Sequence, residues 1–440
     1  MWCWGATMNH EPMRANVSGC SNFGRFVVPR ALALPALTRG MRVATRIPAA
    51  VVALRRVRAA TSTLMGAAAA LLRARARIGA GRALTDYKAP NYWLDYRFGF
   101  VRRGLPGEAL RRVVGGSPTY RQVEATAVGL SRAAALSVVP IALQATRRAP
   151  GRLPRVAATA LLALSPLSTS LLLHDIGRYD AIGVLSLALL AAARPVWRRL
   201  PLPIGTLMLA AVLAVAAATE EFLFAVVAPA AVAAAALLSR AQKLRTDQRL
   251  LLLGAVLAPG AAVAGASLLV PAPDPALLWA RNEATRAGVG PPDAAMGDAL
   301  AALGRSLAEN LAFFRLFEPT AVVTALALWA ALYVVTTALL GRLLGTGSAR
   351  QYHFLVGLHA LVGASLCTVG TDFRRWWGLS LLGLLATLGL SETPPKVDER
   401  VRLTVVAAVA ALALAGLGLR DAPVYPWGEL RLEHSLPAAH

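Results

Sequence analysis

Long apolar stretches alternate with short polar connections over most of this chain. A helix rises about 1.5 Å per residue, so about 20 apolar residues cross the hydrocarbon core of a bilayer. Ten stretches are apolar enough to do so, and the shorter ones would tilt little or thin the bilayer locally. They cover residues 123–145, 156–173, 181–193, 203–218, 222–239, 250–270, 319–340, 352–369, 377–390 and 403–419. The pattern predicts an all-α, polytopic transmembrane helix bundle.

Every second connection between these stretches is basic. Short cytoplasmic loops of membrane proteins are enriched in Lys and Arg, so we predict that these five connections face the cytoplasm. They carry Arg147, Arg148, Arg152 and Arg155; Arg194, Arg198 and Arg199; Arg240, Lys243, Arg245 and Arg249; Arg342 and Arg350; and Lys396, Arg400 and Arg402.

The alternate connections then face outward, and the short ones are acidic. Residues 174–180, 219–221 and 371–375 together hold the five acids Asp175, Asp180, Glu220, Glu221 and Asp372. The longer outward segments are the loop 271–317 and the tail from Arg420. Because random scatter would not place acids on one side, this sorting indicates which end of the bundle holds the candidate chemistry.

The first 85 residues differ from the rest, with thirteen arginines, no lysine and one acid, Glu11. Residues 47–72 form a marginal span, since Arg55, Arg56 and Arg58 each cost about 2.5 to 3.5 kcal/mol near the bilayer centre. If it crosses, there are eleven spans, with the N-terminus in and the C-terminus out. We therefore predict a disordered cytoplasmic leader (1–46), a marginal first span and flank (47–85), an outward amphipathic juxtamembrane segment (86–121), the transmembrane bundle (122–419) with the outward loop 271–317, and an outward tail (420–440).

Composition supports the membrane class: 56% of residues are hydrophobic and the mean hydropathy is +0.54. The net charge of +23 does not point to nucleic acid, because the basic residues recur in short loops between apolar spans. The three cysteines, Cys3, Cys20 and Cys367, have no metal-ligand or disulfide spacing. The expected partner is the lipid bilayer, and the expected location is the cytoplasmic membrane.

The segment 86–121 combines aromatic rings with arginines. Its aromatic residues suit the headgroup interface, and a short amphipathic helix could place Leu110, Val113 and Val114 against lipid. One interpretation is an anchor for anionic headgroups. The other makes the arginines a phosphate clamp, with Asp95 as a general base or a metal ligand. The arginines facing water or phosphate would include Arg97, Arg102, Arg103, Arg111 and Arg112.

Three further groups of polar residues belong to the outward side. His174, Asp175, Arg178 and Asp180 crowd one tight connection, more than a connector of that length needs. Glu220 and Glu221 could cap the following helix, and could instead bind a divalent cation or act as acid and base.

The third group is Asp372, Arg374 and Arg375, beside two tryptophans. It could be an interfacial anchor with a local salt bridge.

Asp95-Tyr-Arg-Phe-Gly-Phe-Val-Arg-Arg-Gly, Gly-Arg-Tyr-Asp at 177–180 and Asp-Phe-Arg-Arg-Trp at 372–376 are short motifs that look like those of uncharacterised bacterial polytopic proteins. In architecture, residues 86–419 resemble the GT-C class of polyprenyl-phosphate-sugar-dependent glycosyltransferases and related envelope polysaccharide polymerases. That resemblance implies a catalytic base in the first outward loop, which by position is Asp95, with Asp86 as a substitute. The segment has no Asp-x-Asp pair, so no metal-binding residues are assigned; the cofactor is unknown, and a divalent cation is one possibility.

The sequence therefore favours a glycosyltransferase that uses a lipid-phosphate-linked sugar on the outer face of the membrane. Arginines would stabilise phosphate charge while a carboxylate, Asp95 or Glu220, deprotonates the acceptor. The alternatives are a transporter or flippase for a lipid-linked glycan, and a non-catalytic membrane protein. Expected substrate-binding residues are Arg97, Arg102, Arg103, His174, Asp175, Arg178, Asp180, Glu221, Asp372, Arg374 and Arg375.

Overall fold

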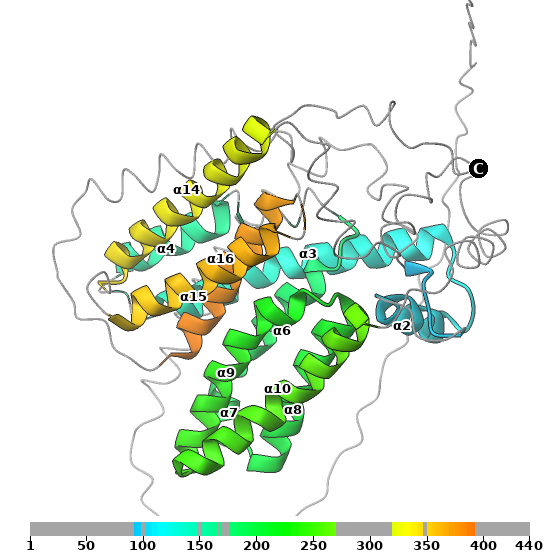
Figure 1. The fold of residues 1–440 in the computed structure, drawn as a ribbon, viewed down its shortest axis with the longest axis horizontal. Coiled ribbons are helices and arrows are strands. Elements are labelled where there is room, and N and C mark those ends of the chain that lie inside the picture. Colours follow the sequence, from blue (N-terminus) through cyan, green and yellow to red (C-terminus); the bar gives the residue numbers. More distant parts are fainter. Residues whose placement is uncertain are drawn as a thin grey trace, which may run out of the picture. The chain divides into compact units, whose positions relative to one another are not determined.

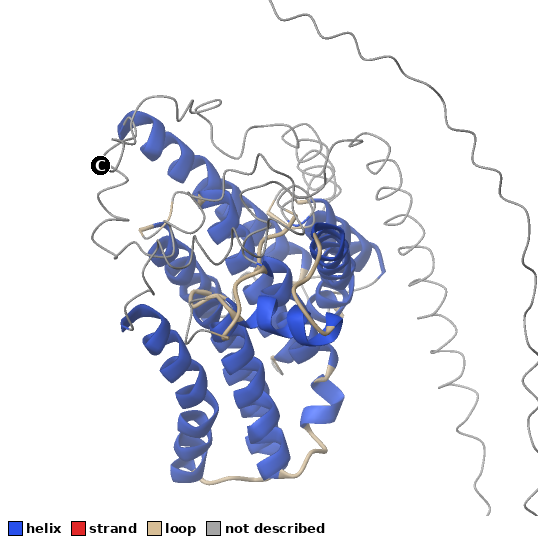
Figure 2. Ribbon diagram, turned by 90° about the vertical axis from the view of Figure 1, so that its right-hand side faces the viewer, coloured by secondary structure: helices blue, strands red, loops and turns tan. Residues whose placement is uncertain are grey.

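The computed structural model describes residues 92–97, 103–147, 149, 152–165, 167–168, 172, 176–269, 319–345, 350–368, 370 and 372–391. Within these ranges the chain is helical and contains no β-strand (Figure 2). The predicted leader (1–46), first span (47–72), loop (271–317), last span (403–419) and tail (420–440) lie outside the described residues.

Eleven helices lie within the described residues (Figure 1). They are α2 (Leu105–Val114), α3 (Tyr120–Thr146), α4 (Arg152–Leu164), α6 (Asp180–Ala192), α7 (Arg194–Trp197), α8 (Leu202–Thr219), α9 (Leu223–Ala241), α10 (Thr246–Leu269), α14 (Pro319–Leu343), α15 (Arg350–Cys367) and α16 (Phe373–Leu390).

Nine of the ten predicted apolar stretches coincide with described helices. Five helices are long and apolar enough to cross a membrane, which marks the chain as a multi-pass integral membrane protein. They are α3, α8, α9, α10 and α14 (residues Val322–Leu343 of the last).

The predicted second stretch, 156–173, is too long, because α4 ends at Leu164. Ser165 precedes Pro166, and a residue before proline is biased away from the helical conformation. The Ser165 hydroxyl then accepts a hydrogen bond from the Leu167 amide at 3.2 Å, and Ser168 donates to the Ser165 carbonyl at 3.0 Å. These local bonds form a serine turn in place of another helical turn.

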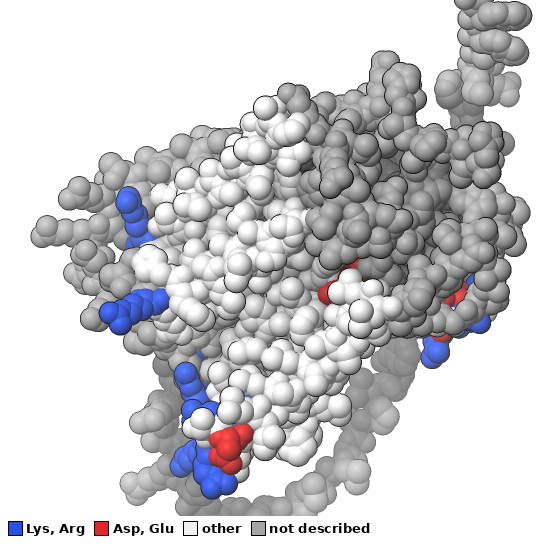
Figure 3. All heavy atoms as spheres, viewed as in Figure 1, with Lys and Arg blue, Asp and Glu red and all other residues white. Residues whose placement is uncertain are grey.

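Successive helices reverse direction, which gives the bundle two distinct ends. We call the end where α6, α9 and α16 begin the acidic end, and the end where they finish the basic end. At the basic end the Gln242 amide donates to the Leu200 carbonyl at 3.0 Å, and Arg194 lies 3.5 Å from the Ser391 carbonyl. Figure 3 shows Lys and Arg side chains gathered at the α9–α10 and α14–α15 turns. The side of the membrane on which each end lies stays a prediction.

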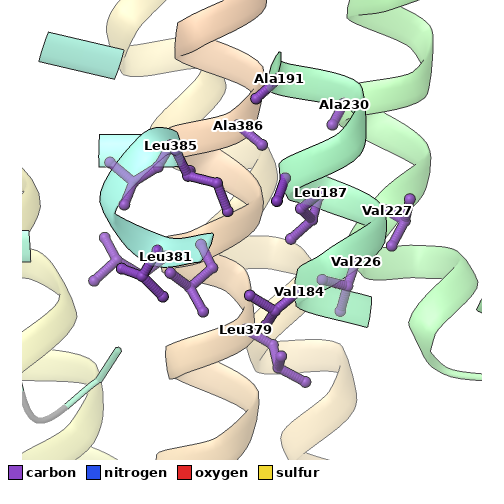
Figure 4. Packing of buried hydrophobic residues seen from close by; sticks show 14 of the residues in the cluster. Val184, Leu187, Ala191, Val226, Val227, Ala230, Leu379, Leu381, Leu385 and Ala386 are labelled. Carbon is purple, nitrogen blue, oxygen red and sulfur yellow. The ribbon is translucent and has the colours of Figure 1, made fainter. Parts of the chain in front are cut away.

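Helices α6, α9 and α16 pack together around an apolar core (Figure 4). Val184, Leu187, Val226 and Leu381 are completely buried there. Glycines allow the close approach: a Cβ on Gly183 would lie 2.7 Å from a Leu223 methyl carbon. Small residues at helix contacts are typical of membrane bundles, where close van der Waals packing replaces a hydrophobic driving force. This core fixes the positions of the three helix ends that carry the charged residues.

Candidate functional site

Arg375, in the first turn of α16, joins two other helix ends at the acidic end of the bundle. Its Nε lies 2.7 and 2.8 Å from the two carboxylate oxygens of Asp180, the first residue of α6. Its Nη2 donates to Glu220, which follows α8, and lies 2.7 Å from Asp180. The guanidinium also lies 4.3 Å from the centre of the Trp376 ring, within cation–π range. One arginine therefore ties α6, α8 and α16 together.

These charges are buried, although the sequence suggested a water-exposed set. The exposed fraction is 3% for Asp180, 2% for Glu220 and 5% for Arg375. Burial tends to raise the pKa of the Glu220 carboxyl, but the nearby charges of Arg375 and Arg103 outweigh it and lower that pKa below its ordinary value. Glu220 is thus held as a carboxylate within an ion-pair network.

A second ion pair joins the connection before α6 to the start of α16. Arg178 Nη1 donates to Asp372 Oδ2, and Arg375 Nη1 lies 3.9 Å from the same oxygen. Arg374 points the other way: it is 1% exposed, and its guanidinium lies 5.5 Å from the centre of the Trp329 ring on α14. The two neighbouring arginines therefore make contacts on different sides of α16.

Residues 92–97 and 103–118, which we call the cap, pack on the acidic end and contain α2. Tyr92 contacts Tyr179 with ring centres 5.6 Å apart, and Trp93 Nε1 donates to the Pro118 carbonyl at 2.7 Å. Gly107 makes this packing possible, since a Cβ there would lie 1.9 Å from the Leu94 carbonyl oxygen. Any larger residue at position 107 would push α2 away from residues 92–94.

Arg103 fastens the cap to the ion-pair network. Its Nη2 lies 3.2 Å from Glu221 Oε1 and 3.6 Å from Glu220 Oε1. Its carbonyl accepts a hydrogen bond from the Tyr179 hydroxyl at 3.3 Å. The Arg103 backbone has φ of +61°, a left-handed conformation that is uncommon for a residue other than glycine. The charge network thus extends from α16 through Glu220 to the cap.

Asp95 lies in the cap and has arginine partners of its own. Its carboxylate accepts hydrogen bonds from the Arg97 amide at 3.0 Å and from Arg97 Nε at 2.8 Å. Arg111 Nε lies 3.7 Å from the same carboxylate. The Arg97 side chain is 36% exposed and that of Arg111 is 26% exposed, so both guanidinium groups reach solvent. The Asp95 side chain itself is only 5% exposed, so the two arginines form the solvent-facing side of this group.

Glu108 holds the arginines of α2 in place. It accepts hydrogen bonds from Arg111 Nη2 at 2.7 Å and from Arg112 Nε at 2.6 Å. These hydrogen bonds, from Arg111 first and Arg112 second, lower the pKa of Glu108 to about 2. The i,i+3 and i,i+4 spacing on α2 makes the triad possible.

The structure thus brings seven of the predicted residues into one network: Arg103, Arg178, Asp180, Glu220, Glu221, Asp372 and Arg375. Asp95 and Arg97 form a separate pair, and Arg374 faces α14. Arg102, His174 and Asp175 lie outside the described residues.

Two details differ from the sequence interpretation, and a third agrees with it. Leu110 is buried in the protein core with Tyr92 and Trp93, so the apolar side of α2 packs on the cap itself. Val113 is 83% exposed, as expected of a residue that faces outward. Arg103 was expected to face water or phosphate, but it is drawn to the carboxylates of Glu220 and Glu221.

The glutamates do not cap α9 either. The residue before α9 is Phe222, and no side chain caps this helix. Glu220 instead adopts an extended backbone with φ of −156° at the end of α8, which directs its side chain to the arginines. The Coulombic attraction of two guanidinium groups replaces the interaction with the helix dipole that the sequence suggested.

Sequence reasoning missed Glu108 and Tyr179 as parts of this region. The spacing of Glu108 from Arg111 and Arg112 was a usable signal for an ion-pair triad on one helix. No local signal pointed to the Tyr179 hydroxyl, since its partner is a backbone carbonyl 76 residues away.

In the described part of the chain, no group of three or more His, Cys, Asp or Glu side chains is arranged to hold a metal ion. Each network carboxylate there has an arginine partner. The arrangement can hold arginines in fixed positions at a membrane surface. Comparison with known proteins found no match to any protein-family model, curated protein or solved structure.

Proposed function

We propose that this integral membrane protein transfers a sugar from a lipid-phosphate donor to an acceptor hydroxyl at the acidic end of its bundle, on the outer face of the cytoplasmic membrane. One observation carries the proposal: Asp95 lies between two partly exposed arginines, Arg97 and Arg111, on a cap that the ion-pair network fastens to the bundle. A base beside cations that can bind phosphate is the chemistry that such a transfer needs.

In the proposed reaction, the acceptor oxygen attacks the anomeric carbon of the donor sugar. The bond from that carbon to the phosphate oxygen breaks, and the lipid phosphate leaves with the electron pair. Asp95 takes the proton of the acceptor hydroxyl. Arg97 and Arg111 stabilise the negative charge that grows on the phosphate, because guanidinium groups bind phosphate oxygens in pairs.

Glu220 serves as a positioning residue in this scheme. It is 2% exposed and engages both Arg375 and Arg103, so its carboxylate is committed to holding the cap and the bundle together. Asp95 is also buried and paired with two arginines, but both of its arginines reach solvent, whereas Arg375 beside Glu220 is only 6% exposed, so we assign the base to Asp95.

The test is sugar transfer by purified protein in lipid nanodiscs with labelled polyprenyl-phosphate sugars. Asp95→Asn keeps the size and an acceptor oxygen but removes the base, and we expect at least a hundredfold loss of turnover, the usual scale for a general base. Asp247→Asn is the matched control, since Asp247 is a 65%-exposed partner of Arg245 at the basic end. Full activity of Asp95→Asn would refute this role for Asp95.

A second readout separates the rival function. Movement of the intact labelled lipid between leaflets, with no new glycosidic bond, would show that the protein acts as a flippase and not as a transferase. If neither transfer nor movement occurs with any donor, the chain is a non-catalytic membrane protein.

A further inference from the structure

Arg103 uses only part of its guanidinium group within the protein. Its Nη2 donates to Glu221, and this is the only side-chain hydrogen bond that Arg103 donates to the described residues. Its Nε is buried and has no hydrogen-bond partner there. A guanidinium carries five N–H donors in a planar fork, so most of its donor capacity is left over. A buried donor without an acceptor is costly and calls for an explanation.

The same arginine is the most exposed member of the network, ahead of Arg178 at 20%. Its side chain is 27% exposed, against 6% for Arg375 and 1% for Glu221. A ligand that approaches from the acidic end can therefore reach Arg103 without displacing the buried pairs of Arg375.

The backbone at Arg103 is held in a strained conformation. The left-handed φ of +61° persists because its two ends are fixed: Tyr179 binds the carbonyl, and Glu220 and Glu221 attract the guanidinium. Strained backbone that the surroundings enforce is concentrated at ligand-binding and catalytic sites. The arrangement presents a pre-oriented guanidinium with donors to spare.

We propose that Arg103 binds a phosphate group, whose oxygens accept N–H groups from the exposed part of the guanidinium while Nη2 keeps its hydrogen bond to Glu221. Phosphate fits because its oxygens match the guanidinium fork and its charge complements the cation. The phosphate could belong to a membrane lipid or be free in solution. As the phosphate of the sugar donor, it rests on the proposed function, but its binding can be measured without any transfer reaction.

The carboxylates beside Arg103 predict in which direction the phosphate affinity should change when one of them is neutralised. Glu221 orients Arg103, but its negative charge also repels an anion bound to the same guanidinium. Glu221→Gln keeps an oxygen that can accept the Nη2 hydrogen bond and removes the charge, so phosphate should bind more tightly to this variant. A purely structural ion pair predicts no such gain.

Binding is measured as a ligand-dependent rise in the unfolding temperature of protein in neutral-lipid nanodiscs. The probes are inorganic phosphate and, incorporated in the nanodiscs, polyprenyl monophosphate or phosphatidic acid. We expect Arg103→Lys, which keeps the charge but loses the fork, to weaken binding about tenfold. Glu221→Gln should strengthen it about threefold, a gain typical of removing one partly screened like charge. Arg245→Gln is the control, because Arg245 is 77% exposed at the basic end and lies outside the network.

Each outcome of these measurements either supports the phosphate site at Arg103 or overturns it. Weaker binding of inorganic phosphate to Arg103→Lys supports a site for the phosphate group itself, and weaker binding of the lipid probes alone supports a lipid phosphate. Equal affinity of wild type and Arg103→Lys for all probes, or no binding by wild type, overturns the inference. Phosphate binding that depends on Arg103 without sugar transfer would leave this site standing and remove the proposed transferase. Sugar transfer that is unchanged in Arg103→Lys would support the transferase and would remove Arg103 as the site that binds the donor phosphate.

Discussion

Arg375→Met would remove the guanidinium from the centre of the buried network while keeping a long apolar side chain. Arg375 donates to both carboxylate oxygens of Asp180. Asp180 would then lose this cation at 3% exposure, whereas Glu220 would keep Arg103 at 3.6 Å. Removing one partner of a buried ion pair typically costs about 3 to 5 kcal/mol, because the other charge stays desolvated. We expect the free energy of unfolding to fall by that amount.

The assay is reversible unfolding in mixed detergent micelles. A double variant distinguishes the effect of an unpaired buried charge from a loss of packing. Arg375→Met with Asp180→Asn also removes the stranded charge, so it should be more stable than Arg375→Met alone by about 1 to 3 kcal/mol, the cost that remains being that of an unsatisfied polar group. A simple loss of packing would not be rescued in this way.

Arg245→Met is the matched control. Arg245 and Asp247 form an ion pair of 3.6 Å whose side chains are 77% and 65% exposed, so its loss should cost less than about 1 kcal/mol. The reasoning is refuted if Arg375→Met costs no more than Arg245→Met, or if Asp180→Asn makes the double variant less stable.

Two further predictions concern the cap and the orientation of the bundle. The pKa of Glu108 is lowered from 4.5 to about 2, so its stabilising contribution is complete above pH 4.5 and is lost as the pH falls toward 2. Hydrogen exchange of α2 should therefore speed up relative to the rest of the bundle over that pH range in wild type but not in Glu108→Gln; the same pH dependence in both would exclude Glu108 as the cause. In cysteine-free protein, Ser117→Cys at an exposed position of the cap should react with an impermeant thiol reagent in intact cells, and Arg245→Cys only in opened cells. The opposite pattern would place the acidic end in the cytoplasm.

The helices could be predicted from the sequence because their signal is local. Length and hydropathy locate α3, α8, α9, α10 and α14, and the boundaries shift by only a few residues where caps intervene. Thr119, for example, starts α3 with a capping box: its hydroxyl accepts from the Gln122 amide at 3.3 Å, and the Gln122 side chain accepts from the Thr119 amide at 2.8 Å.

The charged groups could be assigned to one end of the bundle but not paired. Alternation of spans brings the starts of α6, α9 and α16 to the same end, so the proximity of Asp180, Glu220 and Arg375 follows from topology. The individual pairs depend on helix rotation and packing distance: Arg375 finds Asp180 across 195 residues, and Arg103 finds Glu221 across 118. Hydropathy carries no information about either quantity.

Burial of the network follows from the cap, which the sequence analysis placed on the lipid surface. An amphipathic pattern in α2 is equally consistent with a lipid interface and with a protein surface, because both accept an apolar face. Gly107 decides between them: a glycine in the first turn of a helix is unfavourable by itself, yet it allows the backbone of residues 92–94 to approach. Leu110 then packs inward on the protein, and Arg103 is positioned over Glu220 and Glu221. Glu220 and Glu221 thereby become the buried partners of Arg103, the most exposed arginine of the network.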